Sequence, residues 1–191
     1  MRNLLFILLI TLFVQSCAPL VGTVGMVSLG AASKEKGLGT SINDSLIKTK
    51  ISNLIYKYNK DLIADTKVFV NNGSVLYTGK LNNPNDKIEF TKLAWNIRGV
   101  KEVNNEIQVT DTSSLKNIAR DIASVGEIRA RIMADKSINS INFSIDVVND
   151  TAYISGVATS ELEMNLVKSH ASSARFIKEV YNYIILNKDT R

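Results

Sequence analysis

The chain contains an internal repeat, and this feature constrains the fold more than any other. Residues 44–109 can be placed over residues 121–186 by a shift of 77 positions, without a gap. Many of the superimposed residues are then identical, so the chain is expected to fold as two copies of one module. The identical pairs are Asp44 and Asp121, Ile51 and Ile128, Ile55 and Ile132, Val70 and Val147, Asn72 and Asn149, Gly79 and Gly156, Ala94 and Ala171, Arg98 and Arg175, Lys101 and Lys178, Glu102 and Glu179, Val103 and Val180, Asn105 and Asn182, and Ile107 and Ile184.

Periodicity predicts that each copy begins with a helix and a β-hairpin. Apolar residues recur at helical spacing over residues 47–55 and again over 125–132. Apolar and polar residues then alternate over 66–70. The alternation is interrupted at Asn72-Gly73 and resumes over 75–77. Asn-Gly is the preferred pair for a two-residue hairpin turn, so two antiparallel strands should follow the first helix.

A second helix and a third strand complete each copy. Pro84 suits the first position of a helix, and Ser160 with Glu163 has the spacing of a capping box. Residues 103–109 alternate as a strand. The order predicts an α+β fold of two tandem α-β-β-α-β modules, each with two helices packed on one face of a three-stranded sheet. Modules this small bury marginal cores, so we expect the two to stabilise each other by docking.

The first seventeen residues indicate export followed by lipid attachment. An apolar run from Leu4 to Val14 follows Arg2. It is shorter than the about 20 residues of a membrane-spanning helix but suits the roughly 7–15 apolar residues of an export signal. Val14-Gln15-Ser16-Cys17 resembles the lipobox of bacterial lipoproteins, which implies cleavage before Cys17 and acyl chains such as palmitate on it. The alternative is that Cys17, the only cysteine, is incidental.

These observations divide the chain into four parts. Residues 1–16 are predicted to be a lipoprotein signal peptide. Residues 17–43 are predicted to be a lipidated tether and linker, because they are small, apolar and rich in glycine before they become charged. Residues 44–110 should form the first module and residues 114–188 the second.

Composition and spacing argue against catalysis and against nucleic-acid binding. The net charge of +5 is spread along the chain without a basic block. The single histidine, His170, aligns with Leu93 on the apolar stripe of the second helix, so it is expected to pack. Trp95 aligns with Ser172 and should be partly exposed, either at a module boundary or as a ligand-stacking ring. We expect no enzyme activity, no metal, no small-molecule substrate and no cofactor besides acyl chains on Cys17.

Two motifs resemble those of a known family. The pattern V-x-V-x-N-G-x-V-x-x-x-G stands at Val68–Gly79, and G-V-K-E-V-x-N-x-I stands at Gly99–Ile107. Both are similar to motifs of the BON domain, and two such modules behind a lipobox resemble the dual-BON outer-membrane lipoproteins. The resemblance implies a non-enzymatic protein, lipid-anchored at the periplasmic face of the outer membrane, that maintains envelope integrity. Ala18 after the cysteine is compatible with sorting to that membrane, and retention in the inner membrane is the alternative.

The resemblance also implies that the first helix of the second module binds anionic phospholipid. Guanidinium groups suit phosphate, and apolar side chains beside them could insert into a bilayer. The alternative is a solvated helix face, since Asp121, Glu127 and Asp135 offset the charge. The candidate phospholipid-binding residues are Arg120, Ile122, Arg129, Arg131 and Met133.

The outward face of the second sheet is expected to be apolar. Its last strand should present Tyr181, Tyr183 and Ile185, beside Tyr153 of the hairpin, and an exposed apolar face usually marks an interface. We therefore predict contact with the first module or with a partner protein; the alternative is that the tyrosines only shield the sheet. A second candidate function follows, namely a protein-binding adaptor or scaffold for envelope assembly or cell-wall remodelling. A hydrolase would have to depend on His170.

Overall fold

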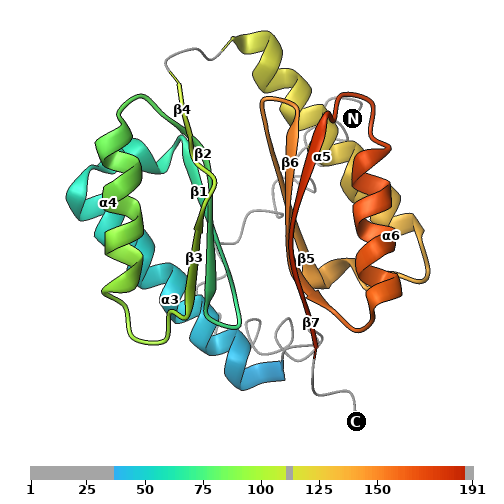
Figure 1. The fold of residues 1–191 in the computed structure, drawn as a ribbon, viewed down its shortest axis with the longest axis horizontal. Coiled ribbons are helices and arrows are strands. Elements are labelled where there is room, and N and C mark those ends of the chain that lie inside the picture. Colours follow the sequence, from blue (N-terminus) through green and yellow to red (C-terminus); the bar gives the residue numbers. More distant parts are fainter. Residues whose placement is uncertain (1–36, 111–113, 188–191) are drawn as a thin grey trace, which may run out of the picture. The chain divides into compact units, whose positions relative to one another are not determined.

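The computed structural model describes residues 37–110 and 114–187, which belong to one compact unit within Ala31–Arg191. The first module follows the predicted order of helix, strand, strand, helix and strand (Figure 1). Its elements are α3 (Gly37–Tyr58), the short 3₁₀ helix η2 (Lys60–Ile63), β1 (Thr66–Asn71), β2 (Ser74–Leu81), α4 (Pro84–Trp95), β3 (Glu102–Asn105) and β4 (Gln108–Val109).

The second module repeats this order, so the predicted α+β fold of two tandem modules is confirmed. In each sheet the first two strands pair antiparallel as a hairpin, and the third strand pairs parallel to the second. Both helices of a module cover the same face of its sheet (Figure 1). The elements of the second module are α5 (Leu115–Ala134), the 3₁₀ helix η3 (Ser140–Asn142), β5 (Phe143–Val148), β6 (Thr151–Ala158), α6 (Glu161–Ser172) and β7 (Glu179–Leu186).

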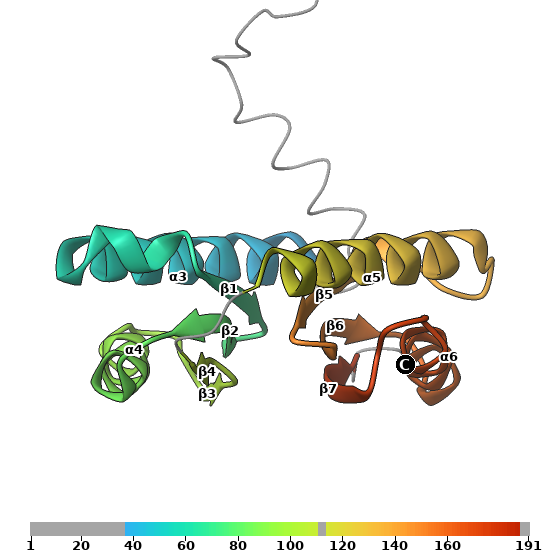
Figure 2. The ribbon, with the colours of Figure 1, turned by 90° about the horizontal axis from the view of Figure 1, so that it is seen from above.

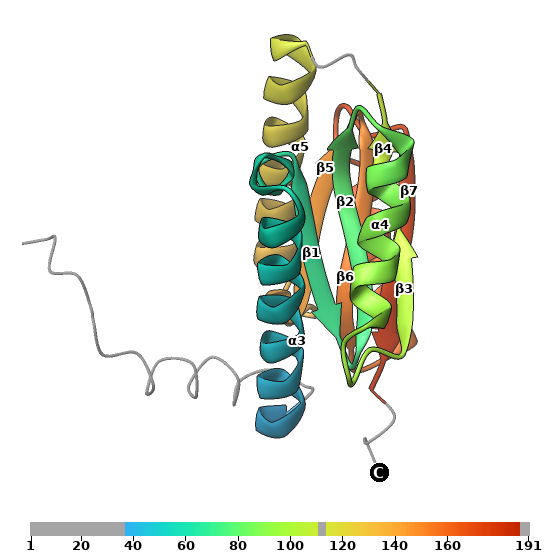
Figure 3. The same cartoon turned by 90° about the vertical axis from the view of Figure 1, so that its left-hand side faces the viewer.

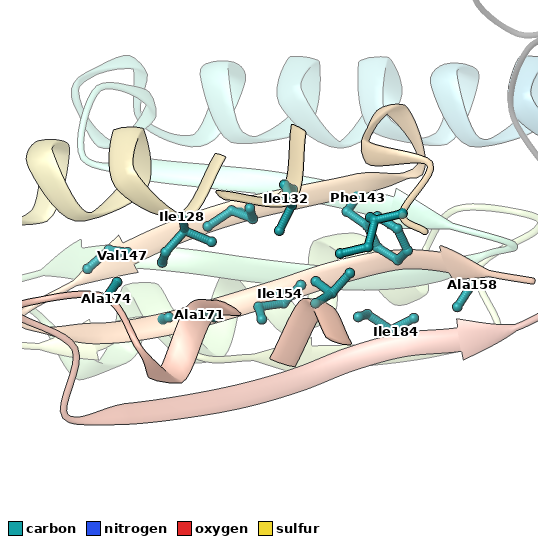
Figure 4. Packing of buried hydrophobic residues seen from close by; sticks show 13 residues of the cluster. Ile128, Ile132, Phe143, Val147, Ile154, Ala158, Ala171, Ala174 and Ile184 are labelled. Atoms are coloured by element: carbon teal, nitrogen blue, oxygen red, sulfur yellow. The ribbon is translucent and has the colours of Figure 1, made fainter. Parts of the chain in front are cut away.

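Each module has its own apolar core between helices and sheet. In the first module Ile51, Tyr77 and Phe90 are fully buried, with the two rings packed edge to face at 5.4 Å. The second core is drawn in Figure 4, where Ile128 and Ile154 lie between α5, α6 and the sheet. None of the helices in the described part of the chain combines the length and apolar character needed to cross a bilayer.

A buried carboxylate ties the first helix of each module to its hairpin turn. Asp44 accepts hydrogen bonds from the backbone N–H groups of Asn72, at 2.9 Å, and Gly73, at 3.0 Å. Asp121 makes the same two bonds to the turn at residues 149–150, both at 3.0 Å. The turn residues have positive φ angles, which expose consecutive N–H groups on one side. The repeated aspartate therefore fixes the position of the turn on the helix.

The repeated glycine is required by a close approach of the backbone. Gly79 has a φ of 122°, and a Cβ atom there would lie 2.1 Å from the carbonyl oxygen of Asp65. A Cβ on Gly156 would lie 2.3 Å from the carbonyl oxygen of Asn142. In both modules the chain crosses over this glycine as it enters the first strand, so no other residue fits without movement of the backbone.

The observed secondary structure differs from the expected one at two places. Residues 37–43, expected in the linker, belong to α3. A helix already held by buried Ile47, Ile51 and Ile55 can extend backwards, since each added residue gains a hydrogen bond without a new nucleation step. The predicted strand at 103–109 is interrupted after Asn105, whose side-chain amide bonds the carbonyl of Lys87 and the hydroxyl of Thr91 on α4.

The core of the first module contains a polar atom that we expect to be dispensable. The hydroxyl of Tyr77 is buried and has no hydrogen-bond partner among the described residues, and burial raises the pKa of Tyr77. The equivalent residue of the second module is Ile154. Tyr77→Phe should raise the free energy of unfolding by about 1 kcal/mol, because it removes the desolvated hydroxyl and keeps the ring. Chemical denaturation measures this change.

Tyr77→Ala is the matched control and should lower the free energy of unfolding by about 3–5 kcal/mol through the cavity that it leaves. A destabilised Tyr77→Phe variant would contradict the assignment of an unpartnered hydroxyl.

Candidate functional site

The open faces of the two sheets meet and enclose a small apolar cluster. Leu76 of β2 packs with Val148 of β5 and Tyr153 of β6, and all three are buried. Phe69 and Tyr183 pack against them and are half-buried. Figure 2 shows the two sheets between α4 and α6, which lie on the outer sides. We call this contact the inter-module face.

The inter-module face pairs equivalent positions of the repeat. Leu76 and Tyr153 are equivalent residues and pack together in the cluster. Tyr183 donates a hydrogen bond to the carboxylate of Glu106, its own equivalent in the first module. Contacts between equivalent positions are typical of a two-fold, isologous interface. The modules therefore dock like the two halves of a homodimer joined in one chain.

A buried carboxylate takes part in the contact between the modules. The Asp146 side chain is 2% exposed and accepts bonds from the Lys67 ammonium and from the Thr78 hydroxyl. The Asn71 amide donates to the hydroxyl of Ser155. Because a buried carboxylate is costly unless it is paired, these bonds couple the positions of the two modules. All of them join one module to the other.

The predicted interface residues are buried to different extents in this face. Tyr153 is buried, and the ring of Tyr181, 43% exposed, stacks on it at 5.5 Å between centroids. Tyr183 and Ile185 are half-buried. Burial, reinforced by the bond to Glu106, raises the pKa of Tyr183, so it remains a hydrogen-bond donor throughout the neutral range.

A groove runs along the edge of the inter-module face, beneath α5. It has a volume of about 720 Å³ and is bordered by the hairpin of the first module and by one flank of α5. Figures 2 and 3 show α3 and α5 on the same side of the two sheets. From the first module, Lys67 and Lys80 reach into the groove, and Lys80 pairs with Asp121 at 3.8 Å.

The flank of α5 that faces this groove carries an exposed apolar stripe. Ile118 is 40% exposed, Ile122 67% and Met133 73%, and Arg129 lies on the same flank as an exposed cation. At about 100° per residue these four positions span about 60° of the helix circumference. Three of them, all except Met133, line the groove itself. We call these four residues the α5 stripe.

Two of the predicted phospholipid-binding residues lie on the opposite flank of α5. Arg120 bonds the carboxylate of Asp150 at 2.9 Å, and its guanidinium lies 4.8 Å from the centre of the Phe176 ring. Arg131 bonds Glu127 at 2.8 Å. The structure therefore brings Ile122, Arg129 and Met133 together but engages Arg120 and Arg131 in contacts within the second module.

The remaining polar candidates have structural contacts. His170 is half-buried and its Nε2 lies 2.8 Å from a carboxylate oxygen of Asp135, which lowers the pKa of Asp135. Glu163 is buried and accepts bonds from the N–H groups of Asn139 and Thr159. Trp95 is 53% exposed, as expected. Within residues 37–110 and 114–187, no group of acidic, histidine or cysteine side chains is placed to hold a metal ion.

Sequence reasoning missed the polar contacts across the inter-module face. Thr78 lies two residues after Leu76 on β2, and strand alternation alone would place both on the open face of the sheet. For the first module, this alternation could therefore have identified the residues of the open face from the sequence. Which residue of the second module each one meets depends on the docking register, which a single sequence does not contain.

Two tandem α-β-β-α-β modules, docked through their open sheet faces, define the class of this protein. A family model of the BON domain matches residues 43–111 and 115–188. The chain therefore belongs to the BON-domain family, as its motifs indicated.

Three curated proteins illustrate the similarity of this chain to known sequences. A protein of Anaplasma centrale described as "Uncharacterized protein in gshII 5'region" is 34% identical over 146 residues, which cover 76% of this chain and 95% of that protein. The "Outer membrane lipoprotein DolP" of Haemophilus influenzae is 26% identical over 182 residues, or 94% of this chain and 93% of that one. The "Osmotically-inducible protein Y" of Escherichia coli is 24% identical over 147 residues, or 76% and 73%.

The pairing across the inter-module face makes a prediction about stability. Lys67→Met should lower the free energy of unfolding by about 2–3 kcal/mol, because it leaves the buried Asp146 carboxylate without its cation. Asp146→Asn should cost about 1 kcal/mol, since the amide oxygen can still accept from Thr78 and the Lys67 side chain, 61% exposed, stays in water. The double variant should resemble Asp146→Asn alone.

Chemical denaturation of the four proteins in this cycle measures the coupling between the two residues. Additive effects of the two single substitutions would show that Lys67 and Asp146 do not act as a pair.

Proposed function

We propose that this chain is a non-enzymatic lipoprotein of the outer membrane that faces the periplasm and helps to maintain the integrity of that membrane. The relative named for an outer-membrane lipoprotein supports this location, because its similarity extends over 94% of this chain. The lipobox at residues 14–17 supports lipid attachment at Cys17, which lies outside the described residues.

In this proposal the α5 stripe contacts anionic phospholipid. The single observation that carries the proposal is the alignment of Ile118, Ile122 and Met133 with the exposed Arg129 on one helix flank. Apolar side chains of an interfacial helix insert among acyl chains, and a cation beside them pairs with lipid phosphate. Arg120 and Arg131 orient α5 within the second module and do not take part in lipid contact.

Flotation of the fragment beginning at Ser33 with vesicles tests the lipid contact. Ile122→Ser combined with Met133→Ser should weaken binding to anionic vesicles by about tenfold or more, because two exposed apolar side chains no longer insert. Arg129→Gln should weaken it by about fivefold, and this loss should disappear at high salt. Arg131→Gln should have a smaller effect than Arg129→Gln.

The matched apolar control is Leu162→Ser on α6, since Leu162 has the same exposed fraction, 67%, as Ile122. Equal losses in Leu162→Ser and Ile122→Ser would contradict a specific role for the α5 stripe. Binding that ignores lipid charge would instead favour a protein-binding adaptor for envelope assembly, with the bilayer contact incidental.

Metabolic labelling with a fatty-acid probe tests the anchor. Wild-type protein should carry the label and Cys17→Ala should lose it, because no other cysteine is present in the chain. Wild-type protein should also separate with the outer-membrane fraction. Label retained by Cys17→Ala would contradict attachment at this residue.

A further inference from the structure

A second charged hollow lies in the first module, away from the inter-module face. It is a groove of about 480 Å³ between α3 and the end of α4. Three cations line it, Lys50 and Lys57 from α3 and Arg98 from the segment after α4, and all three side chains are exposed. Its other lining residues are Asn53, Leu54, Asn96 and Ile97. We call it the module 1 groove.

The described residues that line the module 1 groove include no carboxylate. None of its three cations forms an ion pair with a described residue, and the acidic residues elsewhere in α3 and α4 have other contacts. Asp44 holds the hairpin turn, Asp86 accepts from the Tyr58 hydroxyl at 2.7 Å, and Glu89 pairs with Lys92 at 3.3 Å. Three positive charges also outweigh the roughly half negative charge at the C-terminal end of each of the two helices, α3 and α4.

The equivalent place in the second module carries less positive charge. Glu127 stands where the first module has Lys50, and it accepts a bond from Arg131 at 2.8 Å. It also accepts from the backbone N–H of Arg175, the equivalent of Arg98, at 3.2 Å. The bond from Arg131, followed by that from Arg175, lowers the pKa of Glu127. The two modules thus differ in charge at three equivalent positions, where Lys50, Leu54 and Lys57 of the first module correspond to Glu127, Arg131 and Ala134 of the second.

We propose that the module 1 groove binds a phosphorylated anion that carries at least two negative charges. The observations that carry this inference are the three cations that line one hollow without an ion pair to any described residue, and the smaller positive charge at the equivalent place in the second module. The volume lies within the roughly 300–1,000 Å³ of small-ligand sites. Lysine and arginine donate to phosphate oxygens, and Asn53 and Asn96 add neutral donors. The phosphate can belong to a lipid headgroup or to a soluble molecule.

Calorimetric titration of the full chain in a neutral detergent with inorganic pyrophosphate tests the site. Lys50→Glu should weaken binding by about tenfold or more, because it replaces an attraction by a repulsion at the anion. It should fold, since the second module accommodates Glu127 at the same position. The matched control, Lys168→Glu on an exposed position of α6, makes the same change in net charge and should alter binding less than about twofold.

A neutral variant, Lys57→Gln, removes one cation without adding a repulsion and should weaken pyrophosphate binding by about fivefold. Circular dichroism and thermal unfolding of each variant establish that the fold is retained. Dihexanoyl phosphatidic acid, with dihexanoyl phosphatidylcholine for comparison, then identifies the source of the phosphate. If Lys50→Glu weakens binding of phosphatidic acid as well, the site takes a lipid headgroup; if it weakens only pyrophosphate, the site takes a soluble phosphate.

The proposal is overturned if the wild-type chain binds neither pyrophosphate nor phosphatidic acid. It is also overturned if Lys50→Glu and Lys168→Glu weaken binding equally, since the effect would then follow net charge and not the groove. These outcomes are independent of the α5 stripe, whose residues are unchanged in every variant used here.

Discussion

The bond between a helix carboxylate and a hairpin turn is the constraint on which both modules depend. Asp44 and Asp121 each hold two consecutive N–H groups of a turn whose residues have positive φ angles. With the turn fixed, the register of the hairpin is fixed, and with it the set of side chains on each face of the sheet. A slip of one residue would move Leu76 from the inter-module face to the helix side and Tyr77 from the core to the open face.

The register in turn determines how the modules dock. Two identical copies would place Glu106 against a second glutamate, or Tyr183 against a second tyrosine, at the position where equivalent residues meet. In this chain one copy supplies the hydroxyl and the other the carboxylate, so an isologous geometry carries a complementary hydrogen bond. The buried carboxylate of Asp146 likewise occurs in only one copy. Its equivalent in the first module is Phe69, an apolar neighbour of the cluster. Divergence between the copies therefore made the docking specific to this pair.

Most of the fold could be predicted from the sequence, because the same pattern of core and turn residues occurs in both copies of the repeat. Several of the identical pairs are core side chains, such as Ile51 and Ile128, or residues that the backbone requires, such as Gly79 and Gly156. Less of the candidate site could be predicted from the sequence. Spacing alone could have separated Arg120 from Ile122, because residues two apart on a helix face different directions. The pairing of Lys67 with Asp146 could not be predicted, since it depends on the docking of two surfaces far apart in sequence.

Docking through the open sheet faces leaves the helical layers of both modules free for other contacts. The two layers differ chemically at equivalent positions. The second module balances Glu127 against Arg131 and exposes an apolar stripe on α5. The first has Lys50 in place of the glutamate and exposes cations that form no ion pair within the described part of the chain. Selection for a stable core alone gives no reason for reversing a charge on a solvent-exposed helix. The difference is explained if the two layers meet different chemistry, an apolar bilayer surface at α5 and a phosphate at the module 1 groove.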